Sequence, residues 1–476
     1  FLCTLIFHFL CICNFCLQKV DCKEEIGILR RSELYNNTSL LRTPSNKIAA
    51  MYKKEIGITK IMRCWLTIDD YWNISTNKYN YNFKCGWDLN QWDNFYDYME
   101  RCSAICDEIL LNVRGFHREV VEGKITMKQW RLACKNGIKN YKQRFPKIKY
   151  IEALNEYEQE SFGGLNNDEY YKFYKEFYKI INEINAELKP NIPLLIGGPC
   201  IVGGSLIDGK KKENMRDFFN NYAKDSDPFK KLSFISYHEY HSVENPSILG
   251  IHESLIDQWA KEYGIPTNLP IYITEAGDNS QSRWKTLIED NQLLQATCMA
   301  SQFYFYNLQP DIQAFQWVIQ HKNQDRKNQI YDNLRWSPYG ISLKMQARLA
   351  KRQIRTETPD LVKGKGIYCL AAKDSTKITL LIWNYQWEDG NKSFVIKLDL
   401  KDLPLSVQDG KHQIKEYLLD LKHNNIHTDY PLLSKSEPNI DQLTITRESK
   451  IPKNKEISYT ISLERNAMCL LEIVPE

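Results

Sequence analysis

Short apolar runs recur through most of the chain, and more polar stretches separate them. Many of these runs contain β-branched and aromatic residues and end at a glycine or a polar residue, which predicts buried strands. Seven runs are expected as strands: residues 59–65, 107–113, 150–156, 194–199, 232–240, 269–277 and 312–318. From residue 156 onward, the strand ends follow one another at steps of about 40 residues.

The polar stretches between the runs have helical spacing. In residues 166–190, Asn167 can cap a helix, the apolar residues from Tyr170 to Leu188 fall on one face, and Pro190 stops it. Upstream, residues 25–31 (EIGILRR) are expected to form the first strand of the series.

Strands that alternate with helices at a steady step are typical of a (β/α)8 barrel. An open doubly wound sheet is the rival arrangement, but it usually carries a glycine-rich phosphate turn after its first strand. Residues 197–204 (GGPCIVGG) follow a strand and precede no clear helix, so they are interpreted as a loop. The pattern therefore favours the barrel.

The pattern changes after residues 337–354, which are expected to form the last barrel helix. Short alternating segments follow at 377–385, 393–400, 412–420 and 467–474, as in a β-sandwich. The predicted fold is α/β: a (β/α)8 TIM barrel over residues 23–354, followed by a C-terminal β-sandwich domain over residues 355–476.

Residues 1–22 differ from the rest of the chain. They are apolar, lack acidic residues before Asp21 and hold five of the 14 cysteines. We interpret them as a signal peptide or lipoprotein leader whose start is missing, which predicts a secreted or periplasmic protein, with or without a lipid anchor. A membrane anchor is the competing interpretation, although the run is short for a span. No integral membrane domain is otherwise expected.

Composition and charge narrow the class of partner. The 476 residues are 43% apolar and 12% aromatic, which suits a globular chain with grooves lined by rings. Lys and Arg (63) nearly balance Asp and Glu (59), for a net charge of +4. This balance gives no support for a nucleic-acid or membrane-surface partner.

Two carboxylates carry the candidate chemistry. Glu156 ends the fourth expected strand and Glu275 the seventh, so both point into one mouth, because catalytic groups of such barrels sit at the carboxyl ends of the strands. A pair of carboxylates there suits glycosidic bond cleavage, in which one protonates the leaving oxygen and the other attacks the anomeric carbon or activates water. Glu156 as solvated surface is the simpler alternative.

Several short motifs add a resemblance. These are NE at 155–156, ITEAG at 273–277, MRCWLTIDDYW at 62–72, FISYHEY at 234–240, NSQSRWKTLIEDNQLLQA at 279–296 and LLIWNYQ at 380–386. In order and spacing they resemble glycoside hydrolase family 39, the β-xylosidase and α-L-iduronidase family of retaining barrel glycosidases. The resemblance implies that Glu156 is the acid/base and Glu275 the nucleophile.

The resemblance also implies a set of substrate-binding residues. Asn155 would hydrogen-bond the sugar 2-hydroxyl, Arg63 would hold the nucleophile ionised, His238 and Tyr240 would line the same side, and Trp317 would be the stacking floor. Structural alternatives are an ion pair of Arg63 with a nearby aspartate, a core histidine at 238 and barrel packing of Trp317.

Four positions depart from the family pattern. Tyr157 replaces a proline, Leu154 a tryptophan and Ala276 an aromatic residue, and Trp65 stands where the xylosidases have a histidine that touches sugar hydroxyls. These departures leave the expected reaction class unchanged and bear on the specificity for xylose.

We therefore expect a retaining glycoside hydrolase that works by double displacement on an oligosaccharide or polysaccharide-derived glycoside, first of all as an exo-acting β-xylosidase. The alternatives are a uronidase or endo-β-glycosidase of the same family, or a catalytically inactive carbohydrate-binding barrel. No cofactor is expected. No metal is expected either, because His238 and His241 lack zinc-motif spacing and a third ligand.

Overall fold

The computed structural model describes residues 14–39, 44–80, 84–85, 93–240, 242–278, 288–321, 327–331, 333–357, 361–388, 392–408, 410–425 and 443–476. These residues form two compact units. One unit runs from Arg30 to Ala347, and the other combines residues 14–29 with the chain from Arg348 onward.

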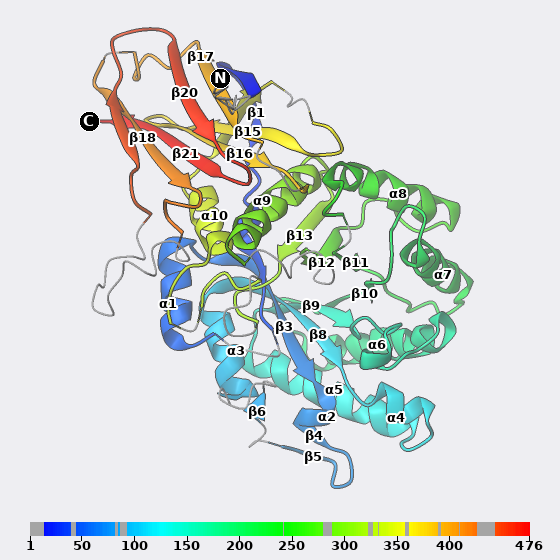
Figure 1. The fold of residues 1–476 in the computed structure, drawn as a ribbon. Helices are drawn as coiled ribbons and strands as arrows, with labels where there is room; N and C mark the ends of the chain where they lie inside the picture. The colour runs from blue at the N-terminus through cyan, green and yellow to red at the C-terminus, as the bar shows by residue number, and fades with distance from the viewer. Residues whose placement is uncertain are drawn as a thin grey trace, which may run out of the picture. The chain divides into compact units, whose positions relative to one another are not determined.

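The first unit contains a closed barrel of eight parallel strands (Figure 1). In chain order the strands are β2 (Tyr35–Asn37), β3 (Thr59–Thr67), β8 (Cys106–Arg114), β9 (Ile148–Ala153), β10 (Leu195–Ile201), β11 (Phe234–Glu239), β12 (Ile271–Ala276) and β13 (Ile312–Gln316). The order around the barrel follows the order along the chain. The predicted TIM barrel is confirmed.

Helices follow the strands on the outside of the barrel (Figure 1). They are α1 (Asn46–Glu55), α2 (Ile68–Tyr71), α3 (Phe95–Ala104), α4 (His117–Val121), α5 (Met127–Arg144), α6 (Asn167–Leu188), α7 (Lys210–Lys224), α8 (His252–Glu262), α9 (Ile288–Asn307) and α10 (Pro338–Ala347), with 3-10 turns η1 (Ser32–Leu34), η2 (Glu160–Phe162) and η3 (Pro246–Ile251). Two short hairpins pair β4 (Trp72–Asn73) with β5 (Lys78–Tyr79) and β6 (Lys84–Cys85) with β7 (Asp93–Asn94).

Helix α6 shows how the sequence sets a helix of this ring. Asn166, one residue before the expected cap, accepts from the Glu169 amide while Glu169 reaches back to the Asn166 amide, so a capping box begins the helix. Its apolar face, which includes Phe173, Phe177 and Ile184, is buried. Lys189 ends it in the left-handed conformation, before Pro190.

An apolar layer fills the barrel below its mouth. Its residues are Ile61, Leu110, Tyr150, Phe234, Tyr272 and Phe315. Side chains of a strand alternate between its two faces, so the residues two positions further on point into the same interior, nearer the mouth. Those on five of the strands are polar and fully buried, namely Arg63, Asn112, Glu152, Ser236 and Thr274. The apolar layer therefore supports a polar layer, on which the candidate site rests.

The second unit is a β-sandwich built from one nine-stranded sheet. The strand order is β19 (Arg447–Lys450), β18 (His412–Leu419), β21 (Met468–Pro475), β16 (Ile378–Tyr385), β15 (Gly366–Lys373), β14 (Arg352–Thr356), β1 (Asn14–Ile28), β17 (Phe394–Lys401) and β20 (Ile457–Leu463). Residues from both ends of this order, such as Ile414 of β18 and Ile461 of β20, share one apolar core. The sheet thus folds onto itself, as the predicted sandwich requires.

The observed units differ from the sequence-based boundaries at the N-terminus. Residues 14–22, assigned above to a leader, form the first part of β1, which pairs with β14 and β17. Gln18, Val20 and Cys22 are buried while the residues between them are exposed, which is the alternation of a strand. Residues 25–28 belong to the same strand, so the expectation that 25–31 begin the barrel is wrong, and β2 begins it. No helix of the described residues is long and apolar enough to cross a membrane.

Candidate active site

The predicted site residues gather at the carboxyl ends of the barrel strands. Arg63 lies in β3, His238 in β11 and Glu275 in β12. Glu156 lies three residues beyond the end of β9 rather than within it, and Trp317 follows β13 directly. Because the carboxyl ends of all strands in a parallel barrel lie at the same end of the barrel, these side chains share one mouth.

A tight turn after β9 directs Glu156 into that mouth. Leu154 and Glu156 have φ angles of 60° and 44°, in the left-handed region that non-glycine residues seldom occupy. The amide of Glu156 donates to the carbonyl oxygen of Cys200 at 3.0 Å, and the amide of Gln159 donates to the carbonyl of Glu156 at 2.8 Å. The Glu156 side chain is 13% exposed, so it remains partly accessible from the mouth.

Arg63 connects the two sides of the site, and its side chain is fully buried. Its Nη1 donates to Glu275 Oε1 at 2.5 Å, and its Nη2 donates to Asn155 Oδ1 at 2.8 Å. Its Nε donates to Glu152 Oε2 at 2.8 Å. Burial alone would lower the pKa of Arg63, but Glu152 and Glu275 raise it above its ordinary value, so the guanidinium keeps its charge.

Glu275 is held from its other oxygen as well. The Tyr240 hydroxyl donates a short hydrogen bond to Glu275 Oε2. Gly277 leaves room for this tyrosine, because a Cβ at that position would lie 2.5 Å from Tyr240 Cε1. Each Glu275 oxygen therefore has its own donor, which fixes the carboxylate plane.

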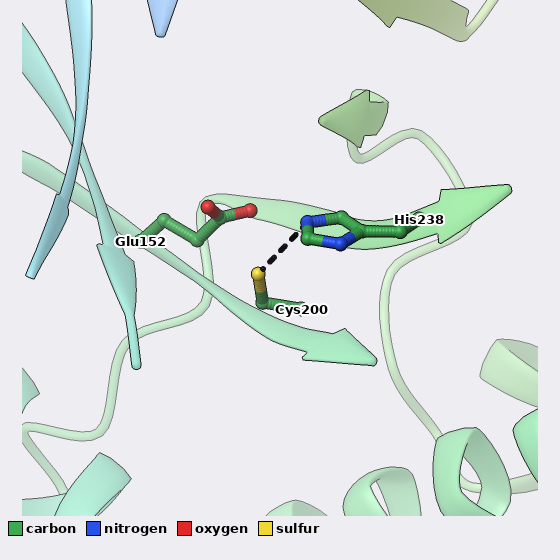
Figure 2. A group of neighbouring side chains, drawn as sticks. All are labelled: Glu152, Cys200 and His238. Atoms are coloured by element: carbon green, nitrogen blue, oxygen red, sulfur yellow. Dashed lines mark hydrogen bonds between the residues drawn. The ribbon is translucent and has the colours of Figure 1, made fainter. Parts of the chain in front are cut away.

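His238 lies between the two candidate carboxylates and is fully buried. Its Nδ1 is 2.7 Å from Glu156 Oε1 and 3.7 Å from Glu275 Oε2. On the other side of the ring, Nε2 is 3.3 Å from Cys200 Sγ. Figure 2 shows the ring projecting from β11 toward Cys200 of the neighbouring strand β10 and Glu152 of β9, one strand further. Both ring nitrogens thus have a partner inside the barrel.

Burial sets the protonation of Glu156 and His238. Burial raises the pKa of Glu156 to about 7, even though Arg63, Lys211 and Arg114 oppose the shift. Burial also lowers the pKa of His238 to about 4. Near neutral pH the histidine is therefore uncharged, while Glu156 can both hold and release a proton.

Glu152 is a buried residue of the candidate site that the sequence analysis missed. It accepts from Arg63, from Asn112 Nδ2 at 2.9 Å and from Thr274 Oγ1 at 2.7 Å. Burial alone would raise its pKa, but Arg63 and these donors bring the pKa below its ordinary value. The sequence did hold a signal for Glu152: it is a charged residue within an apolar strand, two positions after Tyr150, so its side chain points to the same interior face.

The aromatic residues divide between packing and the mouth. Trp65 lies under the Arg63 guanidinium at 4.4 Å and donates from Nε1 to the Thr38 carbonyl. Trp317 is 8% exposed, and its amide donates to the carbonyl of Ala276 beside Glu275. Residues 279–287 of the motif after Glu275 lie outside the described residues.

Two groups of described side chains could hold a cation: Glu152, Cys200 and His238, and Glu156, His238 and Glu275. In each group the candidate ligand atoms lie within 4.8 Å of one another. Arg63 pairs with a carboxylate of each group and already places a positive charge there. His241 lies outside the described residues, and the expectation of no metal stays a prediction.

The fold and this mouth define a (β/α)8 barrel with buried, paired carboxylates, and solved structures of glycoside hydrolases share that fold. A glucosidase from Croceicoccus marinus matches with a TM-score of 0.67 at 12% identity, over 97% of this chain and 99% of its own. A family 39 β-xylosidase from Caulobacter crescentus matches with 0.65 at 13%, over 96% and 100%. No family model and no curated sequence matches the chain.

A third solved structure, the bacterial orthologue of human α-L-iduronidase, matches with a TM-score of 0.68 at 13% identity, over 97% of this chain and 84% of its own. The chain therefore has the fold of glycoside hydrolase family 39 enzymes, as the resemblance implied. The three neighbours differ in the sugar that their names specify, so the shared fold does not select a sugar.

Proposed function

We propose that the protein is a retaining glycoside hydrolase in which Glu275 is the nucleophile and Glu156 the general acid and base. One observation supports this most: a carboxylate oxygen of Glu156 and one of Glu275 lie within 4.8 Å of each other. Retaining glycosidases hold their carboxyl groups about 5 Å apart, whereas inverting enzymes leave roughly 6.5–9.5 Å for a water molecule.

In the first step, a carboxylate oxygen of Glu275 attacks the anomeric carbon. The glycosidic C–O bond breaks, and the proton of Glu156 passes to the leaving oxygen. A pKa of about 7 suits this transfer, because Glu156 is then protonated in a large share of molecules near neutral pH.

In the second step, the ionised Glu156 removes a proton from water. The water oxygen attacks the anomeric carbon, and the ester bond to Glu275 breaks. Arg63 and Tyr240 hold Glu275 in place through both steps, one on each carboxylate oxygen.

Asn155 and Trp317 are proposed to position the sugar. Arg63 donates to Asn155 Oδ1, which leaves the amide nitrogen to donate to the sugar 2-hydroxyl. That bond strengthens as charge develops at the ring. The Trp317 ring is proposed as the platform for the sugar face.

The first substrate class that we propose is a β-xyloside, cleaved from the chain end. The family resemblance and the β-xylosidase among the structural neighbours support it. The glucosidase and iduronidase neighbours make β-glucosides and α-iduronides the substrates to compare. Export from the cytoplasm stays a prediction.

The test is hydrolysis of a panel of aryl glycosides: β-xyloside, β-glucoside, β-galactoside, α-arabinoside and α-iduronide. Wild type is compared with Glu275→Ala and with Glu187→Ala, a matched change in a surface ion pair. We expect release from one sugar that Glu275→Ala abolishes and Glu187→Ala preserves. Activity that survives Glu275→Ala would contradict the assignment of the nucleophile. If neither the aryl glycosides nor polysaccharides are hydrolysed, the result would favour a non-catalytic barrel.

A further inference from the structure

The thiol of Cys200 occupies the centre of the site without a part in the two-step reaction. It lies at the end of β10 and is fully buried. Its carbonyl oxygen accepts from the Glu156 amide, and its sulfur is 3.3 Å from His238 Nε2. Cys200 therefore contacts both the backbone of the acid/base residue and the ring that touches its carboxyl group.

The neighbours of the sulfur determine what it can offer His238. Arg63 Nη2 and Asn112 Nδ2 lie 3.6 and 3.8 Å from the sulfur as secondary donors, while their shorter hydrogen bonds go to Asn155 Oδ1, Glu152 Oε2 and the carbonyl of Leu154. Both neighbours are donors and neither offers the thiol an acceptor, so the thiol proton needs another partner. The nearest acceptor is His238 Nε2, because Asn155 Oδ1 is 3.8 Å away and already accepts from Arg63. Burial raises the pKa of the thiol well above its usual range, so the proton stays on sulfur.

A neutral imidazole has one N–H and one lone pair. If Nε2 accepts from the thiol, the ring proton sits on Nδ1, which faces Glu156 Oε1 at 2.7 Å. In the opposite tautomer, Nε2–H would point at a sulfur already faced by two donors, and Nδ1 would present a lone pair to the carboxyl group. The contacts thus favour the Nδ1–H form.

We propose that Cys200 is a positioning residue that fixes His238 in the Nδ1–H tautomer and thereby places the acid proton on Glu156 Oε2. His238 donates to Oε1 whether Glu156 is protonated or ionised, so Oε1 never needs to carry the proton. Oε2 is then the oxygen that exchanges the proton with the leaving group and with water. This proposal deepens the proposed function and rests on the role given there to Glu156.

Removal of the thiol should trap the acid proton. In Cys200→Ala, Nε2 loses its donor, the ring can take its proton on Nε2, and Nδ1 can accept from a protonated Glu156 Oε1. The proton would then be held away from the leaving oxygen. Cys200→Ser keeps a donor at the same position and should restore the wild-type arrangement. Larger β-branched residues are unsuitable, because Cys200 has a φ of 57°.

The tautomer can be measured directly by ¹⁵N NMR on histidine-labelled protein, with the His238 signals identified by their loss in His238→Gln. We expect Nδ1–H in wild type and in Cys200→Ser, and a shift toward Nε2–H in Cys200→Ala. Cys134→Ala, a change at another buried thiol, should leave the spectrum unchanged. This measurement does not depend on turnover, so it decides the tautomer even if the proposed function fails.

Kinetics test the consequence for the reaction. With phenyl β-xyloside, whose leaving group needs a proton, Cys200→Ala should lower kcat/KM by about tenfold, part of the usual contribution of a general acid. With 2,4-dinitrophenyl β-xyloside, which leaves without a proton, the loss should stay below about threefold. The alkaline limb of the pH profile should also move to higher pH, because the trapped proton leaves less readily.

Several outcomes would overturn the proposal. These are Nε2–H in the wild-type protein, a tautomer that Cys200→Ala does not change, or equal losses on both substrates, which a general distortion of the site would cause. If wild type cleaves neither xyloside, that result counts against the proposed substrate, and the NMR result still decides the role of Cys200.

Discussion

The two candidate catalytic carboxylates share one mouth and have opposite surroundings. Glu275 is held by a cation on one oxygen and a phenol on the other, through Arg63 and Tyr240. Glu156 has no cation within 4 Å among the described residues, and its closest side-chain partner is the neutral His238. The barrel thus places a charged frame, made of Arg63 with Glu152 and Glu275, beside the buried carboxyl group of Glu156, which can titrate.

The difference lies in how each carboxylate enters the mouth. Glu275 sits on a strand, so the polar layer of the barrel reaches it through Arg63, which also contacts Glu152. Glu156 sits on a turn beyond its strand and is oriented by the backbone of Cys200. A rigid strand suits the nucleophile role proposed for Glu275, and a buried turn suits the proton transfer proposed for Glu156.

The largest expected effect is at Glu275. Glu275→Ala should lower kcat by at least about 10⁴-fold, because it removes the carboxylate on which the proposed covalent intermediate forms. A small anion such as azide should enter the vacated space and restore turnover of an activated aryl glycoside. Rescue that gives a glycosyl azide of inverted configuration would support the assignment. The absence of any loss in Glu275→Ala would refute it.

Glu156→Gln should lower kcat/KM by about 10²–10⁴-fold on substrates with poor leaving groups, the usual contribution of a general acid. Dinitrophenyl glycosides should lose less in the first step. In wild type, kcat/KM should fall as pH rises through about 7, because the free enzyme needs a protonated Glu156. A pH profile flat from 6 to 9 would contradict the role of this residue.

Arg63→Met tests the charged frame as a structural element. The change leaves Glu152 and Glu275 buried without their cation, which should cost about 3–5 kcal/mol of unfolding free energy. Arg144→Met is the matched control, since its pair with Glu100 is half exposed and should cost less than about 1 kcal/mol. Urea unfolding measures both. Equal costs would mean that the frame contributes no special stability.

Tyr240→Phe should have the smallest effect. It removes one donor from Glu275 and keeps the ring, so kcat should fall by about tenfold while the unfolding free energy changes by roughly 1 kcal/mol. A loss as large as that of Glu275→Ala would instead point to a direct part for the phenol in the reaction. Steady-state kinetics on the substrate found with the panel would separate the two.

The sequence predicted most of the barrel because its strands are apolar runs. It failed at β2, two of whose three residues are asparagines: the Asn36 amide donates to Tyr52 and Gln329, and the Asn37 amide to the carbonyl of Thr274. Hydrophobic periodicity cannot find a strand that is buried through hydrogen bonds. The segment read as a glycine-rich loop likewise begins as part of β10, where a Cβ on Gly197 would lie 2.4 Å from the Phe234 carbonyl.

The site was predictable only as far as its residues lie in motifs. The structure brings Arg63, Asn155, Glu156, His238, Tyr240 and Glu275 together, as expected. The sequence analysis did not identify Glu152 and Cys200 as site residues, because their contacts are with strands that are far apart in the sequence. The raised pKa of Glu156 also depends on burial that only the fold creates.

The most direct test of the account is the configuration of the first product. Hydrolysis of the glycoside found with the panel can be followed by proton NMR from the earliest time points, before the free sugar interconverts between anomers. Double displacement at Glu275, with Glu156 as acid and base, predicts a first product with the same anomeric configuration as the substrate. A first product of opposite configuration would show a single displacement by water and contradict the account.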